Sequence, residues 1–176
     1  RTEFAAQFQR RDFLLHDLYE DDFRLGVTDA RSDNFGVVLS HTRPGTLFGR
    51  PNELTLGLAP AYETEHSANY RNDNGEIDRT TPTALAFTRG INFPVFLENN
   101  ITASEKVSLL VAGQFVWIDR EFEDRFWSDD DGDQSARQIF RGFNPKAGFV
   151  FQRTPHDQVF MNLSRSFQPP SFDDLN

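Results

Sequence analysis

Hydrophobic and polar residues alternate over several long stretches of this chain. The clearest stretch is Lys106–Ile118. Its first set of alternating positions holds Val107, Leu109, Val111, Phe115 and Trp117, and its second set holds Lys106, Ser108, Ala112 and Gln114. Side chains of a β-strand point alternately to the two faces of its sheet. The pattern therefore predicts a strand with one apolar face and one polar face.

The same alternation recurs along the chain and predicts seven strands. They are Thr2–Arg11, Phe35–Thr42, Glu53–Asn69, Leu85–Ala103, Lys106–Phe126, Arg137–Arg153 and Gln158–Phe167. Pro60 lies inside the third of these, and proline is disfavoured in a strand that is paired on both sides. A bulge or a local edge is expected there.

The connections between these strands alternate between short and long. The short ones are Ala103–Lys106, Thr154–Asp157 and a break at Arg43-Pro44-Gly45 that leads into a turn over Leu47–Pro51. The long ones are Asp12–Asn34, Asn69–Pro82 and the acidic Asp119–Arg137; a helical turn over Phe13–Tyr19 is possible in the first. Membrane β-barrels have short turns on one side and long loops on the other. The predicted fold is all-β: a segment of an antiparallel up-and-down transmembrane β-barrel, an open curved sheet when taken alone.

Composition agrees with this fold. The 176 residues include 19 phenylalanines, but no segment approaches the ~20 apolar residues that a spanning helix needs. The formal net charge of −9 argues against nucleic acid, whose partners carry a basic surface. Because there is no cysteine, disulfide scaffolds and thiolate metal sites are excluded.

Signals for catalysis or metal binding are weak. Asp129-x-Asp131-x-Asp133 resembles the start of a calcium loop, but Gln134 and Phe140 occupy positions where that loop needs glycine and glutamate. A solvated acidic loop is the favoured interpretation. The four histidines form no zinc-spaced pair, and no nucleophile elbow or phosphate loop occurs. We expect no enzyme activity, no cofactor and no metal.

The last third of the chain carries a more specific pattern. Phe143-Asn144-Pro145-Lys146-Ala147-Gly148-Phe149-Val150-Phe151 is followed, after a short turn, by Asn162-Leu163-Ser164-Arg165-Ser166-Phe167-Gln168-Pro169-Pro170-Ser171-Phe172. This run resembles a recurrent barrel hairpin of the TonB-dependent outer-membrane receptors, and Arg89–Ser108 resembles the hairpin before it.

The resemblance implies a 22-stranded barrel in the outer membrane of a Gram-negative cell, with a plug domain and a TonB box. Residues 1–176 are then expected to be a fragment of the barrel domain that lacks both parts and transports nothing alone. The implied function is import of an iron-siderophore or similar nutrient, with outer-membrane lipid, a ferric siderophore and the TonB complex as partners. The alternatives are a passive porin or adhesin barrel and a soluble all-β carbohydrate-binding module.

Four residues at the rim of the long acidic loop combine positive charge with surfaces for stacking. These candidate ligand-binding residues are Arg125, Phe126, Trp127 and Arg137. Guanidinium groups pair with anions, and aromatic faces stack on planar ligands. The competing interpretation is that they anchor the loop or belong to the aromatic girdle at the membrane surface.

Overall fold

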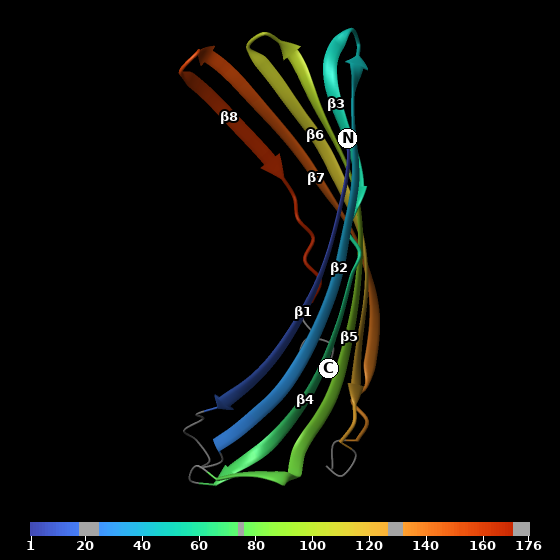
Figure 1. Ribbon diagram of the computed structural model, residues 1–176, viewed down its shortest axis with the longest axis vertical. Helices are drawn as coiled ribbons and strands as arrows, with labels where there is room; N and C mark the ends of the chain where they lie inside the picture. Colours follow the sequence, from blue (N-terminus) through green and yellow to red (C-terminus); the bar gives the residue numbers. More distant parts are fainter. Residues whose placement is uncertain (18–24, 74–75, 127–131, 171–176) are drawn as a thin grey trace.

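Eight β-strands form one curved antiparallel sheet (Figure 1). The computed structural model describes residues 1–17, 25–73, 76–126 and 132–170. The strands are β1 (Thr2–Asp17), β2 (Leu25–Leu47), β3 (Arg50–Leu58), β4 (Ala61–Asp73), β5 (Glu76–Ser104), β6 (Val107–Asp124), β7 (Ala136–Thr154) and β8 (Asp157–Ser164). In the described part of the chain, no helix is long and apolar enough to cross a membrane.

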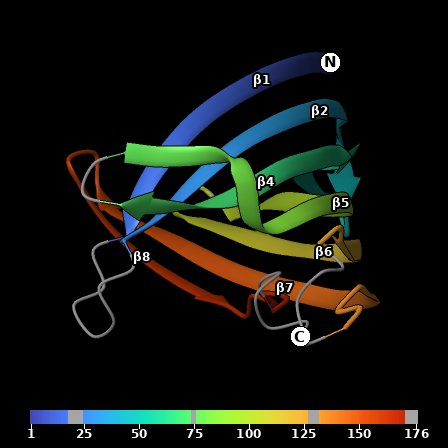
Figure 2. The ribbon, with the colours of Figure 1, turned by 90° about the horizontal axis from the view of Figure 1, so that it is seen from below.

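The strands follow one another across the sheet, and β1 and β8 form its two edges (Figure 2). Strands β3 and β4 share one place, because each pairs with β2 on one side and β5 on the other. Ala59-Pro60 separates them, yet the Pro60 carbonyl accepts from the Val37 amide at 2.9 Å. The predicted third strand is therefore two collinear strands, and the expected irregularity at Pro60 is confirmed.

Three short hairpins lie together at one end of the sheet, which we call the turn end (Figure 1). Two of them, at Glu105-Lys106 and Pro155-His156, are the predicted ones. The third turn, Phe48-Gly49 with φ angles of 52° and 73°, lies within the predicted Leu47–Pro51 segment. The predicted break at Arg43-Pro44-Gly45 is wrong, because β2 continues to Leu47. Within β2, Pro44 pairs with Glu53 of β3.

The opposite end, the loop end, contains more strand than the sequence predicted. Asp12–Asn34 and Asn69–Pro82 were expected to be loops, but this is wrong for their described residues, because β1, β2, β4 and β5 extend through them. The alternative of a helical turn in the first is wrong for its described residues, which continue β1. The charged residues there pair across strands, as Arg10 does with Asp33 at 2.5 Å.

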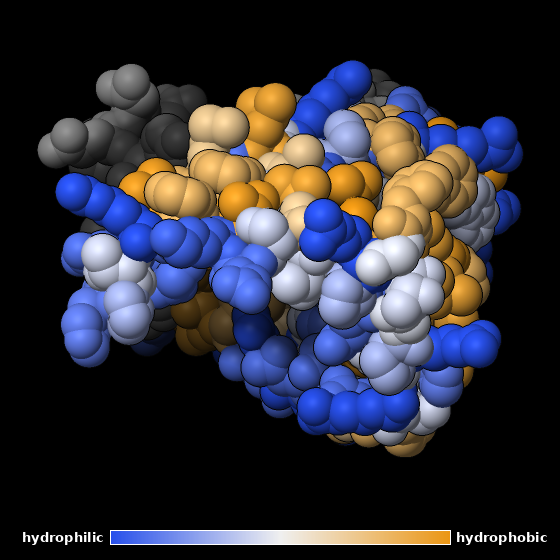
Figure 3. Space-filling view, turned by 90° about the horizontal axis from the view of Figure 1, so that it is seen from above, coloured by the Kyte–Doolittle hydropathy of each residue, from blue (hydrophilic) through white to orange (hydrophobic). Residues whose placement is uncertain are grey.

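The two faces of the sheet differ in chemistry. Beyond β8 the chain lies on the concave side (Figure 1), where the Phe167 amide donates to Asn144 Oδ1 at 2.6 Å. Asn144 therefore faces the concave side, and by alternation Phe143 and its partner Phe115 face the convex side. The convex face carries exposed apolar side chains on successive strands, among them Phe4, Phe8, Phe35, Leu39, Leu56, Val95, Leu97, Leu109, Val111, Phe115, Phe143, Met161 and Leu163. Seen from the turn end, hydrophobic residues gather along one margin of the sheet and hydrophilic ones along the other (Figure 3).

The border of this apolar band runs obliquely across the strands. On the convex face of β1 the first charged residue beyond the band is Arg10, whose register row passes through Arg89 and ends at Arg137 in β7. Directly after β8 the first charged residue is Arg165, whose amide donates to the carbonyl oxygen of Pro145. Pro145 lies eight residues beyond Arg137 along β7. The border keeps to the row of Arg10 at Asp33 in β2 and Arg89 in β5, and it moves toward the turn end at Asp119 in β6 and Arg141 in β7. Strands of outer-membrane barrels tilt by about 35–45°.

Candidate functional site

The concave face carries a polar row across its centre. Glu98 in β5, Lys146 in β7 and Ser164 in β8 share one register row through Ala112. One step toward the loop end, Asn144 Nδ2 donates to Gln114 Oε1 at 3.0 Å. These side chains line an open hollow of about 340 Å³ together with Ser166. The row offers both charges and several amide and hydroxyl groups, which are the groups that recognise a polar solute.

Two glycines on the concave face make room for aromatic rings. The Phe96 ring from β5 lies across Gly57 in β3, and a Cβ at position 57 would lie 2.8 Å from ring atom Cε1. The Phe167 ring lies across Gly142 in the same way, where a Cβ would lie 2.7 Å from Phe167 Cβ. Such contacts are shorter than Cβ atoms accept, so both rings depend on glycine opposite them. They set the shape of the concave surface on either side of the polar row.

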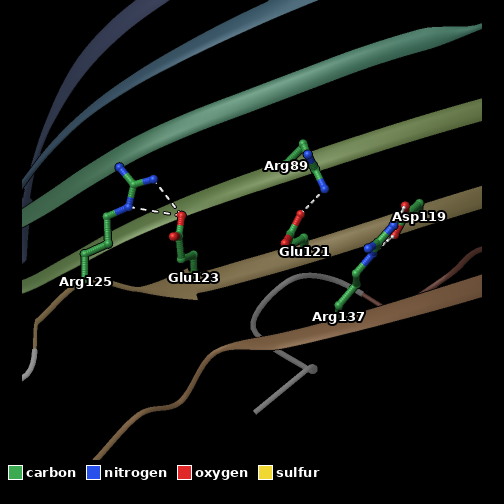
Figure 4. A network of polar contacts seen from close by, with 6 residues as sticks. All are labelled: Arg89, Asp119, Glu121, Glu123, Arg125 and Arg137. Carbon is green, nitrogen blue, oxygen red and sulfur yellow. Dashed lines mark hydrogen bonds and ion pairs between the residues drawn. The ribbon is translucent and has the colours of Figure 1, made fainter.

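A cluster of ion pairs lies beyond the apolar band on the convex face (Figure 4). This outer cluster consists of Arg89, Asp119, Glu121, Glu123, Arg125 and Arg137. Arg137 donates to Asp119 from Nε at 3.0 Å and from Nη2 at 2.6 Å, Arg89 pairs with Glu121, and Arg125 pairs with Glu123 at 2.6 Å. Alternation along β6 places the three acids on the same face as Phe115 and Trp117.

Asp119 is the most buried member of the outer cluster. Its side chain is 4% exposed, whereas that of Arg137 is 54% exposed. The hydrogen bonds from Arg137 hold the pKa of the Asp119 carboxyl below its ordinary value, and the nearby charge of Arg89 acts in the same direction against the effect of burial. The carboxylate therefore stays ionised in spite of its burial.

The structure describes three of the four candidate ligand-binding residues and places two of them in one cluster. Arg125 and Arg137 lie in the outer cluster on the convex face, and the Arg125 guanidinium also lies 4.5 Å from the Phe87 ring centre. Phe126 is half-buried, and its amide donates to Asp124 Oδ1 at 2.9 Å. Trp127 lies outside the described residues. Ligand contact by these four stays a prediction; the paired charges of the two arginines agree with the interpretation that they anchor the loop.

The partners of these arginines were missed. The sequence predicts Asp119 as the start of the acidic loop and indicates no role for Arg89, although both follow the alternation of their strands. Of the calcium-like run, Asp129 and Asp131 lie outside the described residues, and the Asp133 carboxylate accepts from the Ser135 amide at 2.9 Å. In the described ranges, no group of three or more His, Cys, Asp or Glu side chains is arranged to hold a metal ion.

A tilted antiparallel sheet with an apolar convex face, a polar concave face and short turns at one end defines a segment of a transmembrane-type β-barrel wall. The family profile described as TonB dependent receptor-like, beta-barrel, matches residues 2–176. The chain therefore belongs to the TonB-dependent receptor β-barrel family, as its C-terminal motif predicted. A search of curated protein sequences gave no match.

Solved structures of receptors from this family are similar in fold. The unliganded ferric citrate transporter FecA is 11% identical with a TM-score of 0.76, over 93% of this chain and 24% of its own. The ferric-catecholate import receptor Fiu of E. coli K12 is 12% identical with a TM-score of 0.71, over 96% of this chain and 32% of its own. The ferripyoverdine receptor of the outer membrane of Pseudomonas aeruginosa, bound to ferripyoverdine, is 13% identical with a TM-score of 0.67, over 92% and 24%. This chain spans about a quarter to a third of the length of these receptors.

Proposed function

We propose that this chain forms part of the wall of a receptor in the outer membrane of a Gram-negative cell, and that the receptor imports an iron chelate or a similar scarce nutrient with energy supplied through TonB. The observation that supports this most is the match of the two-faced sheet to the TonB-dependent receptor family over nearly its full length. The convex face then contacts lipid, and the concave face lines the passage.

The dimensions of the convex face support contact with a bilayer. From Val107 to Trp117, β6 presents apolar residues or glycine at every second position. At ~3.3 Å per residue and the strand tilt of about 40° that is usual in outer-membrane barrels, this stretch rises roughly 25 Å, which matches the ~25 Å apolar band of such barrels. In the described residues, side chains as large as Phe115 and Leu163 are 46% and 75% exposed on this face. Lipid would cover them.

The concave polar row supports passage of a polar solute. The similar receptors are described as taking ferric citrate, ferric catecholates or ferripyoverdine, all of them iron chelates. Such chelates present oxygen acceptors, and Lys146, Gln114 and Asn144 can donate hydrogen bonds to them. Ferric chelates are therefore the substrate class that we propose.

Cysteine labelling tests the two faces. This segment contains no cysteine, so Val111→Cys and Ala112→Cys each introduce one thiol into it, on opposite faces of β6, and the unaltered full-length protein is the labelling control. In outer membranes that contain the full-length protein, a maleimide confined to the hydrocarbon layer should label position 111, and a water-soluble maleimide should label position 112. Equal labelling of both by either reagent contradicts the proposed wall.

Uptake tests the transport step and separates it from passive diffusion. Cells that express the full-length protein should accumulate ⁵⁵Fe from at least one of ferric citrate, a ferric catecholate or ferripyoverdine, and deletion of TonB should abolish this uptake. Uptake that survives loss of TonB would indicate a passive barrel. If no chelate is taken up while the labelling pattern holds, the membrane position stands and the substrate class is wrong.

A further inference from the structure

The hairpin that joins β2 and β3 ends in an exposed aromatic ring. Phe48 at its tip is 95% exposed, more than any other large apolar side chain in the described residues. A Cβ at the neighbouring Gly49 would meet no atom within 4 Å, so the tip stands clear of the rest of the described sheet at the turn end (Figure 1). The Phe48 ring therefore contributes almost nothing to the packing of this fold.

The backbone at Phe48 is also strained. Phe48 and Gly49 both have positive φ angles, as the two central residues of a type I′ hairpin turn do. Asparagine, aspartate and glycine favour these positions, whereas a bulky residue with positive φ is in a sterically costly conformation. Among the described residues, Phe48 is the only one besides glycines with a positive φ. Neither packing nor turn geometry explains a phenylalanine at this position.

An unpaired cation accompanies the ring. Arg50 directly follows the turn, and in the described part of the chain it has no ion pair and no side-chain hydrogen bond. The nearest carboxylate along the two strands of the hairpin is that of Glu53, which alternation places on the opposite face of β3. The adjacent turn carries Glu105 and Lys106, whose charges cancel. The tip thus combines an apolar ring with a surplus of one positive charge and the five N–H donors of a guanidinium.

The tip lies beyond the membrane when the wall is placed as proposed. Leu54 is the last apolar residue on the convex face of β3, and Asn52 and Arg50 follow it toward the turn. Four residues at ~3.3 Å each and the usual tilt of about 40° place Arg50 roughly 10 Å beyond Leu54 along the barrel axis. A head-group layer is about 5–7 Å thick. The tip therefore passes through this layer into the compartment on the turn side, which is the periplasm of a Gram-negative cell.

The small apolar area of the tip determines what it can bind. Leu47 is half-buried, and Thr46 and Gly49 are not large apolar residues, so Phe48 alone offers a broad apolar contact. A stable protein interface covers about 800 Å² on each partner, which one ring does not supply. One ring and one guanidinium instead match one sugar and one carboxylate, because the C–H face of a sugar packs on an aromatic ring and a carboxylate accepts paired hydrogen bonds from arginine. A polymer that repeats these two groups gains from many weak contacts.

We propose that the β2–β3 tip binds peptidoglycan, an inference that rests on the proposed outer-membrane position. Phe48 packs on a sugar of the glycan strand, and Arg50 binds a carboxylate of a stem peptide. This polymer carries both groups in its repeating unit and lies in the compartment that the turn end faces. The contact ties the wall of the receptor to the layer beneath the membrane, and it offsets the strain that Phe48 causes in the turn.

Cosedimentation of the purified full-length protein with purified peptidoglycan sacculi in neutral detergent tests this contact. Phe48→Asn removes the ring and places a favoured residue in the turn, and Arg50→Gln removes the charge. Each should lower the affinity for sacculi by about fivefold or more, the scale of one ring contact or one charge-assisted hydrogen bond, and Phe48→Trp should retain it. Arg43→Gln is the matched control and should change the affinity less than about twofold, because Arg43 is on the same face of the hairpin but opposite Leu54, at the border of the apolar band.

Two further measurements separate the parts of the proposal. Sacculi treated with an amidase, which keep the glycan strands but lose the stem peptides, should bind the unaltered protein as weakly as intact sacculi bind Arg50→Gln. Thermal unfolding should show Phe48→Asn to be at least as stable as the unaltered protein, since the new residue relieves the strain at the turn. Lost binding is then not the result of lost folding.

The proposal is overturned if Phe48→Asn binds sacculi as the unaltered protein does, or if no form of the protein cosediments with them. It is also overturned if a photo-crosslinking phenylalanine analogue at position 48 attaches in cells to a protein and not to peptidoglycan. Labelling at positions 111 and 112 decides separately whether the wall is in the membrane, so a failure confined to sacculi leaves the proposed function intact.

Discussion

Replacement of Gly57 by alanine should destabilise the centre of the sheet. The added Cβ would lie 2.8 Å from Cε1 of the Phe96 ring and 2.9 Å from the backbone oxygen of Leu39. Rotation of Phe96 relieves the first contact but not the second, because the carbonyl belongs to the adjacent strand β2. The ring must therefore leave the glycine, and strand β3 must also shift.

The cost follows from the two overlaps. Forcing extra atoms into a packed position costs typically 1–3 kcal/mol, and two simultaneous overlaps, one with backbone, suggest about 2 kcal/mol. Gly36→Ala in β2 is the matched control, because Gly36 is also on the concave face and a Cβ there would meet only Gln7, at 3.5 Å. That substitution should be neutral or stabilise by about 0.5 kcal/mol, because glycine within a strand carries an entropic penalty.

Amide hydrogen exchange in the full-length protein measures both effects. A loss of about 2 kcal/mol should raise the opening equilibrium of the amides around Gly57 roughly 30-fold, whereas Gly36→Ala should leave the amides around it as protected as before. Phe96→Leu in the Gly57→Ala background should recover part of the protection, because a shorter side chain removes the ring overlap. Equal exchange in the two single variants would refute the packing argument.

Three further outcomes are expected. Gly142→Ala should displace the Phe167 ring and expose the segment after β8, so the Phe167 amide should exchange at least tenfold faster, and an unchanged rate would refute the contact. The pKa of Asp119 is lowered, so its ion pair stabilises the folded protein at pH values above the ordinary pKa of 3.8, and this stabilisation is lost as the pH falls through the lower folded pKa. Below pH 4 the urea midpoint of Asp119→Asn should therefore fall less than that of the unaltered protein, and identical pH profiles would contradict this. Leu109→Arg on the convex face should cost about 2–4 kcal/mol in a bilayer and Ala112→Arg on the concave face much less; urea unfolding in vesicles measures both, and equal costs would contradict the assigned faces.

The sequence predicted the part of the sheet that lies within the apolar band. For β6 the predicted Lys106–Phe126 compares with Val107–Asp124, and for β7 the predicted Arg137–Arg153 compares with Ala136–Thr154. In this region one face is apolar and the other polar, so alternation is visible in a single strand. The antiparallel order and the three short hairpins followed from it, although the strand before the third hairpin was predicted to end too early.

Beyond the band the same rule fails, because both faces carry polar residues. Asp12 and Asp33 look like loop residues in isolation, and only the neighbouring strand supplies Arg31 and Arg10 as their partners. Pairing of this kind depends on register, which a single sequence does not reveal. The predicted loops were consequently too long at the loop end.

The candidate ligand-binding residues show the same limit. Arg137 was chosen for its charge beside the acidic loop, and its bidentate partner Asp119 is 18 residues away in sequence. Counting alternate positions back from Phe143 would have placed Arg137 on the convex face. The predicted strand Arg137–Arg153 already contains that position, but the pairing of Arg137 with Asp119 depends on the register of β7 against β6.

The oblique border of the apolar band affects how the concave face is organised. In a wall of tilted strands, residues that are hydrogen-bonded neighbours on adjacent strands do not lie at the same height, so each register row follows a helical path around the wall. A solute moving straight along the axis therefore leaves one row and meets the next, as from the Gln114–Asn144 pair to the row of Glu98 and Lys146. Contacts at one depth therefore come from side chains of different rows, and the contacting position shifts along the sequence from each strand to the next.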